Sequence, residues 1–367
     1  MRTELSDKLG ITHPIFAFTP SEHVAAAVSR AGGLGVLGCV RFNDAAELDE
    51  VLTWMDSNTD GKPYGVDIVM PAKVPSEGSA TDLSQYIPDD HKAFVQETLR
   101  KLGVPPLPAD DDPHREGVLG WLHSVARAHV EVALKHRPAL IANALGSPPK
   151  DVIDQAHEQN TPVAALAGKA KHAISHLDNG VDIIIAQGTE AGGHTGEIAT
   201  MVLVPEIVDA VGDRGHVLAA GGIGSGRQAA AALALGAHGV WMGSYWLTAS
   251  EYQMGNNDAV KRALLAAGSD QTVRSRVYSG KPARLLRTKW TDAWDEDGAP
   301  SPLPMPLQNL LVNDAHQRIA ASNNPEVVAM PVGQIVGRMN SERPVAELIA
   351  ELVAEFDSTV GRLDKLR

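Results

Sequence analysis

One glycine-rich stretch of this 367-residue sequence places a histidine where acid–base chemistry could occur. Residues 181–187 form a nearly continuous apolar run ending in Gln187, which is typical of a strand buried on both faces. Gly188 and Gly193 follow, and His194 stands directly after them. Dense glycines let backbone amides approach a flat ligand, and an imidazole at the end of a strand can accept a substrate proton. We therefore predict that His194 is catalytic or contacts substrate, rather than only bonding its own loop.

Two further turns have the composition of a phosphate site. The first contains Gly221, Gly222, Ile223 and Gly224, and a helix is expected to begin near Ser225 or Gly226. Free amides at a helix start, together with the helix dipole, bind anions. Gly243 and Ser244 follow the next apolar run, one helix later. Either turn alone is compatible with ordinary loop glycines, but barrels commonly hold a phosphate on the loops after their last two strands. The pair therefore predicts such a site.

The elements that must position these loops follow an alternating pattern. Short apolar runs alternate with helix-length segments, which is typical of a parallel α/β fold. A count of eight strands favours a closed (β/α)8 TIM barrel, although an open doubly wound sheet has the same periodicity. The expected strands are 14–18, 34–38, 64–70, 139–145, 162–167, 181–187, 216–220 and 238–243, and the helices between them are 21–31, 44–57, 117–136, 149–160, 169–179, 200–212 and 225–236.

Two segments exceed a bare barrel, so we expect a barrel over residues 1–250 and a C-terminal extension over 251–367. Residues 71–116, rich in proline and acids, form an insertion after the third strand, with a helix around 89–102. This insertion is either a cover for the active site or a solvated loop without a role. The extension should contain helices that pack on or near the barrel mouth, and it should end in an amphipathic helix that starts near Pro344.

Other motifs are weaker. Gly33, Gly35 and Gly38 fit a dinucleotide fingerprint but follow a helix, and the G-x-G-x-x-A pattern at 224–229 lacks its downstream acid, so a Rossmann domain is disfavoured.

The sequence also contains a histidine pair that could bind a metal and a cysteine that could act as a nucleophile, but neither is expected to form a functional site. His172 and His176 have zinc-compatible spacing but no adjacent acid, so we expect an exposed helix face and no metal site. Cys39, the single cysteine, is expected to be a buried core thiol and excludes a disulfide framework.

Composition narrows the class of partner. The net charge of −13 and the absence of a basic run argue against nucleic acid and anionic membranes. No apolar stretch is long enough to span a membrane, and residues 1–20 do not resemble a signal peptide, so a cytoplasmic enzyme is expected. In so acidic a chain, an anionic cofactor must be held by local donors.

The combined motifs resemble those of the nitronate monooxygenase family, formerly 2-nitropropane dioxygenases. The similarity covers about residues 5–250 and is clearest in AQGTEAGGHTGE, AAGGIGSG and WMGSYW; Gln334 in VGQIVG is less distinctive. The resemblance implies an FMN-dependent TIM barrel. His194 matches the family's catalytic histidine, while Gln187 and Gly188 match residues lining the flavin. The matching phosphate-site residues are Gly221, Gly222, Ile223, Gly243 and Ser244, and Gly193 and Gly224 lie in the same loops.

The sequence also departs from the family pattern. Asp67 stands where the family commonly has an asparagine near the flavin ring, and residues 16–19 replace a Gln-x-x-Met-type segment. The implied reaction is oxidation of an alkyl nitronate by O2 to a carbonyl compound and nitrite, with a homodimer left open. The alternatives are an NAD(P)H-dependent FMN reductase of a quinone or enoyl thioester, a flavin-binding sensory module, and a phosphate-sugar barrel enzyme without flavin.

Overall fold

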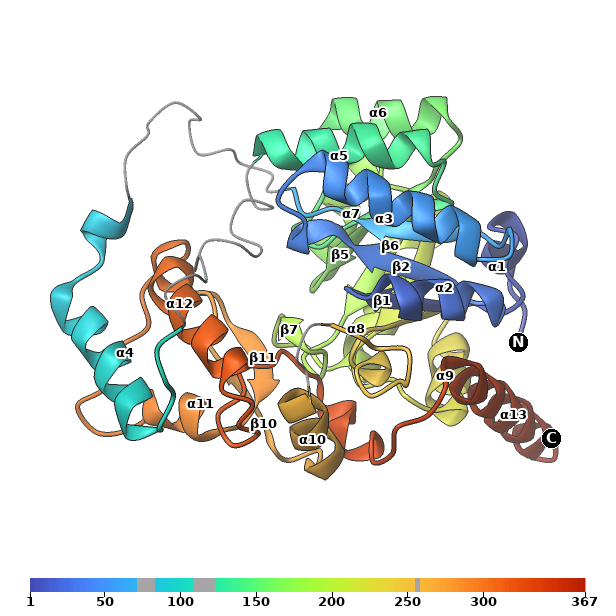
Figure 1. The fold of residues 1–367 in the computed structure, drawn as a ribbon. Coiled ribbons are helices and arrows are strands. Elements are labelled where there is room, and N and C mark those ends of the chain that lie inside the picture. Colours follow the sequence, from blue (N-terminus) through green and yellow to red (C-terminus); the bar gives the residue numbers. More distant parts are fainter. Residues whose placement is uncertain (71–82, 108–122, 255–257, 367) are drawn as a thin grey trace.

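A closed barrel of eight parallel strands forms the larger part of the molecule (Figure 1). The computed structural model describes residues 1–70, 83–107, 123–254 and 258–366. The strands pair in the order β1-β2-β3-β4-β5-β6-β8-β9, and β9 pairs with β1 to close the ring. Their bounds are β1 Ile15–Thr19, β2 Leu34–Gly38, β3 Tyr64–Asp67, β4 Leu140–Asn143, β5 Val163–Ala167, β6 Ile183–Gln187, β8 His216–Ala220 and β9 Gly239–Met242. This confirms the predicted TIM barrel and excludes the doubly wound and Rossmann alternatives.

Helices surround the barrel in the predicted places. They are α2 Glu22–Arg30, α3 Ala45–Asn58, α5 His123–Lys135, α6 Lys150–Glu158, α7 Ala170–Asp178, α8 Thr200–Val211 and α9 Gly226–Ala234, with α1 Glu4–Lys8 before the first strand. The helix expected over 117–136 is described only from His123 onward. Packing is closest between α2 and β2, because a side chain at Gly35 would place its Cβ 2.0 Å from the Ala25 carbonyl oxygen.

Two apolar clusters distinguish the inside of the barrel from its outside. Side chains such as Leu37, Val66 and Ala186 pack outward against the helices. Their strand neighbours, among them Val36 and Ile185, fill the lumen. Because successive strand residues point to opposite faces, this alternation assigns a direction to every strand position. Leu5 of α1 joins the lumen cluster, so this helix closes the end of the barrel opposite the site loops.

A second lobe lies beside the barrel in Figure 1 and has an apolar core of its own. We use the name second lobe for η2 Leu83–Tyr86, α4 Asp89–Lys101, β10 Thr272–Ser275, β11 Ala283–Leu286, α11 Lys289–Ala293 and α12 Leu307–Ala321. The described part of the insertion therefore shares a core with the extension: Val95 and Leu99 of α4 pack with Val312 and Ile319 of α12. The helix expected around 89–102 is confirmed.

The rest of the extension returns to the barrel. After α10 Asp258–Ala266 and the second lobe, the short helix η6 Gln334–Arg338 lies near the loops after β8 and β9. The final helix, α13 Val345–Asp364, packs on α9 and α2, and its apolar stripe includes Leu348, Ile349 and Leu352. The predicted C-terminal amphipathic helix is thus confirmed, with the barrel wall as its partner.

Three smaller expectations have mixed outcomes. Cys39 is fully buried, as expected. The exposed-face interpretation is wrong for His176, which is only 8% exposed and contacts the Ser147 hydroxyl and the Leu166 carbonyl, whereas His172 is exposed. Among the described residues, no group of three or more histidine, cysteine and acidic side chains could hold a metal, and no helix is long and apolar enough to cross a membrane.

Candidate active site

Two polar side chains face the lumen at the carboxyl ends of the strands. On β3, Val66 packs outward, so its neighbour Asp67 faces inward. On β6, Ile183 and Ile185 lie in the lumen, and Gln187 continues the same inward series. The structure therefore brings these two predicted flavin-lining residues to one end of the barrel, which we call the mouth.

Small residues occupy other inward positions at the mouth. These positions carry Gly38 after the inward Val36 of β2, Ala220 at the end of β8, and Gly243 directly after β9. Phe18 and Trp241 lie beneath them, stacked with their ring centroids 6.3 Å apart. A Cβ at Gly243 would lie 3.6 Å from Phe18, an ordinary contact, so the fold itself does not require glycine there. The small residues leave room for a flat ligand above an aromatic floor.

The loop after β6 is held tightly against the start of α8. The Glu190 carboxylate accepts hydrogen bonds from the Thr200 amide (2.9 Å) and the Thr200 hydroxyl (2.8 Å), which caps the helix. The Gly188 amide donates to the Ala220 carbonyl at 2.9 Å and so ties the loop to β8. A Cβ at Gly188 would lie 2.1 Å from the Thr200 hydroxyl oxygen, so this position requires glycine.

His194 is positioned by the second lobe. Gly193 and His194 form the short strand β7 (Gly193–His194), which pairs antiparallel with β11 through Ala283 and Arg284. The His194 Nε2 atom lies 2.6 Å from the hydroxyl oxygen of Ser279, a buried residue 85 positions later in the chain. The Arg284 guanidinium adds a bond to the Thr189 carbonyl at 2.8 Å. The barrel provides the loop, and the second lobe fixes the imidazole.

The surroundings of His194 favour its neutral form. Burial lowers its pKa below the ordinary value, and the nearby Lys281 ammonium lowers that pKa further. A neutral imidazole can act as a base at neutral pH. When Nε2–H donates to Ser279, the other ring nitrogen carries the lone pair and can take a proton from a substrate carbon. The resulting imidazolium can then donate a hydrogen bond to the anion that has formed.

The turn after β8 presents two unpaired amides. Gly221 (φ 109°) and Gly222 (φ 69°) adopt left-handed backbone conformations that favour glycine. In the part of the chain that the structure describes, the amides of Gly222 and Ile223 have no hydrogen-bond partner. Ile223 is buried, and an unpaired buried amide is costly unless a ligand satisfies it. These two amides therefore fit an anion.

The start of α9 differs from the expectation. The Gly224 amide donates to the Gln228 side-chain oxygen at 3.0 Å, and the Gly226 amide donates to the Glu355 carboxylate of α13 at 2.8 Å. These two amides at the helix start are thus already satisfied by the chain itself. The unpaired amides lie one and two residues earlier, because α13 packs directly on α9 and places its own carboxylate at the helix end.

A segment of the extension covers the turns after β8 and β9, for which the sequence predicts a phosphate site and which we call the phosphate turns. The Gly333 amide donates to the Ser244 hydroxyl at 2.8 Å, which leaves the hydroxyl hydrogen free to donate to an anion. The Gln334 amide donates to the Glu190 carbonyl at 2.9 Å. A Cβ at Gly192 would lie 2.7 Å from the Gly333 nitrogen, so these two segments of the backbone are in direct contact. Residues 331–338 therefore connect the loop that carries His194 with the phosphate turns.

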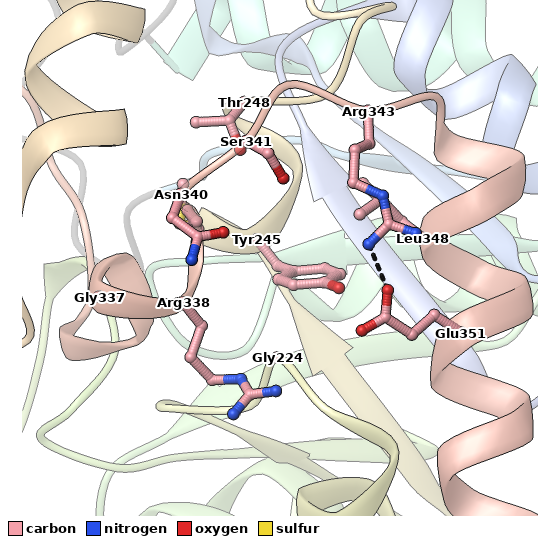
Figure 2. Close-up of a pocket in the computed structure, with 11 residues that line it drawn as sticks. Gly224, Tyr245, Thr248, Gly337, Arg338, Asn340, Ser341, Arg343, Leu348 and Glu351 are labelled. Atoms are coloured by element: carbon pink, nitrogen blue, oxygen red, sulfur yellow. Dashed lines mark hydrogen bonds and ion pairs between the residues drawn. The ribbon is translucent and has the colours of Figure 1, made fainter.

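A polar cavity of about 320 Å³ is lined by Gly224, Tyr245 and residues of the extension. Figure 2 shows these residues. Arg343 is committed there to ion pairs with Glu347 and Glu351. Arg338 points instead toward the loop at Gly224 and also lines the neighbouring cleft, which contains Gly222 and Ile223. Arg338 is thus a cation beside the turn with the unpaired amides.

The sequence predicted most of the residues at the mouth but not the residues that contact them and hold them in place. Asp67, Gln187 and the glycines of the three loops were singled out, whereas Ser279, Glu190 and Arg338 were not. A serine in SGKPAR carries no signal until its contact across 85 residues is known. Of residues 331–338, only Gln334 in VGQIVG was singled out from the sequence.

The geometry is that of a TIM barrel whose mouth carries small residues above an aromatic pair, with unpaired amides in the turn after β8. The model of the nitronate monooxygenase family matches residues 2–355 of the chain. A protein of Mycobacterium tuberculosis, classed by inference as a monooxygenase, is 48% identical over 379 residues and covers 100% of this chain and 99% of its own. The chain belongs to the nitronate monooxygenase family, a family of oxidoreductases.

Two solved structures resemble the whole molecule. Nitroalkane oxidase from Streptomyces ansochromogenes has a TM-score of 0.79 and 26% identity, covering 98% of this chain and 99% of its own. FabK from Thermotoga maritima has a TM-score of 0.74 and 26% identity, with 100% of both chains covered. The family and the nitroalkane oxidase support oxidation of nitro compounds as the general activity.

Proposed function

We propose that this protein is an FMN-dependent monooxygenase that oxidises alkyl nitronates with O2 to a carbonyl compound and nitrite. The observation that carries the proposal is His194, held neutral by burial and fixed through Ser279 at the loop after β6. Asp67 and Gln187 at the mouth and the unpaired amides after β8 supply the cofactor site beside it. Family membership and the nitroalkane oxidase likeness support the choice of a nitro compound.

The residues fit FMN in its two parts. The ring would lie on the small residues above Phe18 and Trp241, beside Asp67 and Gln187. The phosphate would accept hydrogen bonds from the Gly222 and Ile223 amides and the Ser244 hydroxyl, with Arg338 as the nearby cation. Local donors of this kind are what a chain with a net charge of −13 needs to hold a dianion. When bound, FMN supplies the electron transfer between substrate and O2.

His194 has two tasks in this proposal. With a neutral nitroalkane, it takes the proton from the carbon next to the nitro group, and the electron pair of that C–H bond moves into the nitro group to give the nitronate. With a nitronate as substrate, no proton has to be removed, and the imidazole orients the anion in its other tautomer, in which Nε2 accepts from the Ser279 hydroxyl and Nδ1–H donates to the substrate. Gly193 and the loop backbone hold the imidazole at the edge of the ring site.

The main experiment combines a spectrum with oxygen uptake. The purified protein should be yellow with flavin absorbance, and it should consume O2 and release nitrite when given propionate 3-nitronate. A colourless protein that cannot be loaded with FMN would overturn the cofactor proposal. Anaerobic mixing with NADH or NADPH tests the reductase alternative: rapid bleaching of the flavin, with no nitronate-dependent oxygen uptake, would replace the monooxygenase by the reductase of a quinone or enoyl thioester.

A further inference from the structure

Of the residues that the structure describes, one is a buried acid in the lumen at the mouth that the proposed reaction does not use. Asp67 is 2% exposed and stands at the carboxyl end of β3, facing inward with Gln187. Its inward direction follows from Val66 and Ile68, which pack outward on either side of it. A flat ligand on the mouth floor would meet this carboxyl group.

Within the described ranges of the chain, no neighbouring cation lowers the pKa of Asp67. Burial raises the pKa of this carboxyl group to about 7, and the amide of Ala144 opposes the rise. The titratable neighbour on η1 (Cys39–Arg41) is Cys39, whose own thiol pKa is raised, first by burial and then by Asp67. Arg41 acts on Cys39, the pKa of Tyr64 at the start of β3 is raised first by burial and in small part by Cys39, and His194 stands on the loop after β6 at the same end of the barrel. Gln187 is uncharged.

The hydrogen-bonding capacity of Asp67 depends on its proton. An ionised carboxylate only accepts hydrogen bonds, whereas the neutral acid also donates one. The polar edge of a flavin ring carries two carbonyl oxygens that need donors, beside one N–H that needs an acceptor. A buried carboxylate facing those oxygens would place like partial charges together, and a buried acid would satisfy them.

We propose that Asp67 serves the flavin site as a neutral carboxylic acid whose O–H donates a hydrogen bond to the ring. This inference rests on the proposed function, because it requires a flavin at the mouth. Its consequence is a linkage: flavin binds the protonated form, so affinity is highest below the pKa of Asp67 and declines as pH rises through it. The decline should approach about tenfold for each pH unit above about 7.

The experiment is the FMN dissociation constant of the full chain, measured by quenching of flavin fluorescence between about pH 6 and about pH 9. Asp67→Asn keeps the size and the donor but removes the titration, so its affinity should stay level where the wild type weakens. The FMN phosphate itself titrates near about pH 6, and this contribution is common to both proteins. Riboflavin, which has no phosphate, should give the same difference between the two proteins. His172→Asn, on the exposed side of α7, should keep the wild-type pH dependence.

Each outcome decides a different point. No FMN binding at any pH would overturn the proposed function. FMN binding with the same pH dependence in wild type and Asp67→Asn would overturn this inference alone, as would a wild type whose affinity is level throughout. An Asp67→Asn protein that binds FMN more weakly than wild type at every pH would assign the ionised carboxylate to the site, again against the inference.

Thermal stability provides a second measurement that does not depend on flavin. The folded pKa of Asp67, about 7, lies above its ordinary value, so its favourable contribution is complete at low pH and is lost as pH rises through about 7. Relative to wild type, Asp67→Asn should therefore gain in Tm from about pH 4 to about pH 8. A Tm difference that is constant over this range would show that Asp67 is ionised in the folded protein and would contradict the inference.

Discussion

The barrel mouth and the second lobe contribute to one site in different ways. The barrel supplies backbone and small side chains: the glycines after β6, β8 and β9 and the open floor above Phe18 and Trp241. The second lobe supplies orientation, through β11, which pairs with β7, and through Ser279, which contacts His194. The difference teaches that the glycine-rich turns of the mouth arise from regular local structure, while the orientation of His194 depends on a long-range contact.

The largest effect is expected where the two regions meet. His194→Asn should lower kcat/KM for a neutral nitroalkane by about 10²- to 10⁴-fold, because the base that removes the proton is lost. The loss with a preformed nitronate should be much smaller, since no proton is removed. His172→Asn on the exposed side of α7 is the matched control and should leave both substrates unchanged. Equal losses with both substrates would assign His194 to binding alone.

Two glycines on the barrel side separate folding from binding. Gly188→Ala should cost about 1–3 kcal/mol of stability, because its Cβ would lie 2.1 Å from the Thr200 hydroxyl oxygen. Gly243→Ala makes only an ordinary 3.6 Å contact with Phe18 and should keep the wild-type Tm. Its methyl group would enter the ring site and weaken FMN binding by about tenfold, or about 1.4 kcal/mol. Calorimetry and flavin titration of both variants test this, and full FMN affinity in Gly243→Ala would contradict the proposed ring position.

A change in the second lobe should have a moderate effect on catalysis. Ser279→Ala removes the hydroxyl that fixes His194 Nε2 and should lower kcat/KM for a nitroalkane by about tenfold, the value of one hydrogen bond. FMN affinity should hardly change, because Ser279 lies outside the phosphate turns and the floor. Ser57→Ala, on an exposed position of α3, is the control. A loss of FMN with unchanged proton removal would reverse the division between the two regions.

The smallest effect concerns pH. Lys281 lowers the pKa of His194, so activity with a nitroalkane should fall on the acid side only below the ordinary histidine range. Lys281→Gln removes this charge and should move that acid limb to higher pH, while burial still keeps the His194 pKa low. Lys289→Gln, farther along the second lobe, should leave the pH profile in place. If the acid limb of the pH–activity profile lies at the same pH in Lys281→Gln as in wild type, a group other than His194 titrates there.

The fold was largely predictable because its signals are local. Each barrel strand is an apolar run buried on both faces, and each helix has its own periodicity. Segments such as residues 34–38 and 216–220 can therefore be recognised as strands from the sequence. The exposed-face interpretation of His176 failed for the opposite reason, because its burial depends on Ser147 and Leu166, which other elements bring to it.

The site was predictable where function requires a particular backbone. Gly221 and Gly222 need positive φ, and Gly188 needs space beside Thr200, so these positions must be glycine and can be recognised in the sequence. The amide expected to be free at Gly226 was not, because the Glu355 carboxylate arrives from a helix 129 residues later.

The sequence by itself determined the barrel, the order of its loops and the identity of the histidine that stands on one of them, since periodicity and glycine requirements act over a few neighbouring residues. Only the tertiary structure decided that Ser279 holds His194, that residues 331–338 cover the phosphate turns, and that Asp67 is buried. Burial and contact depend on which distant elements pack together, and no short stretch of sequence contains that information.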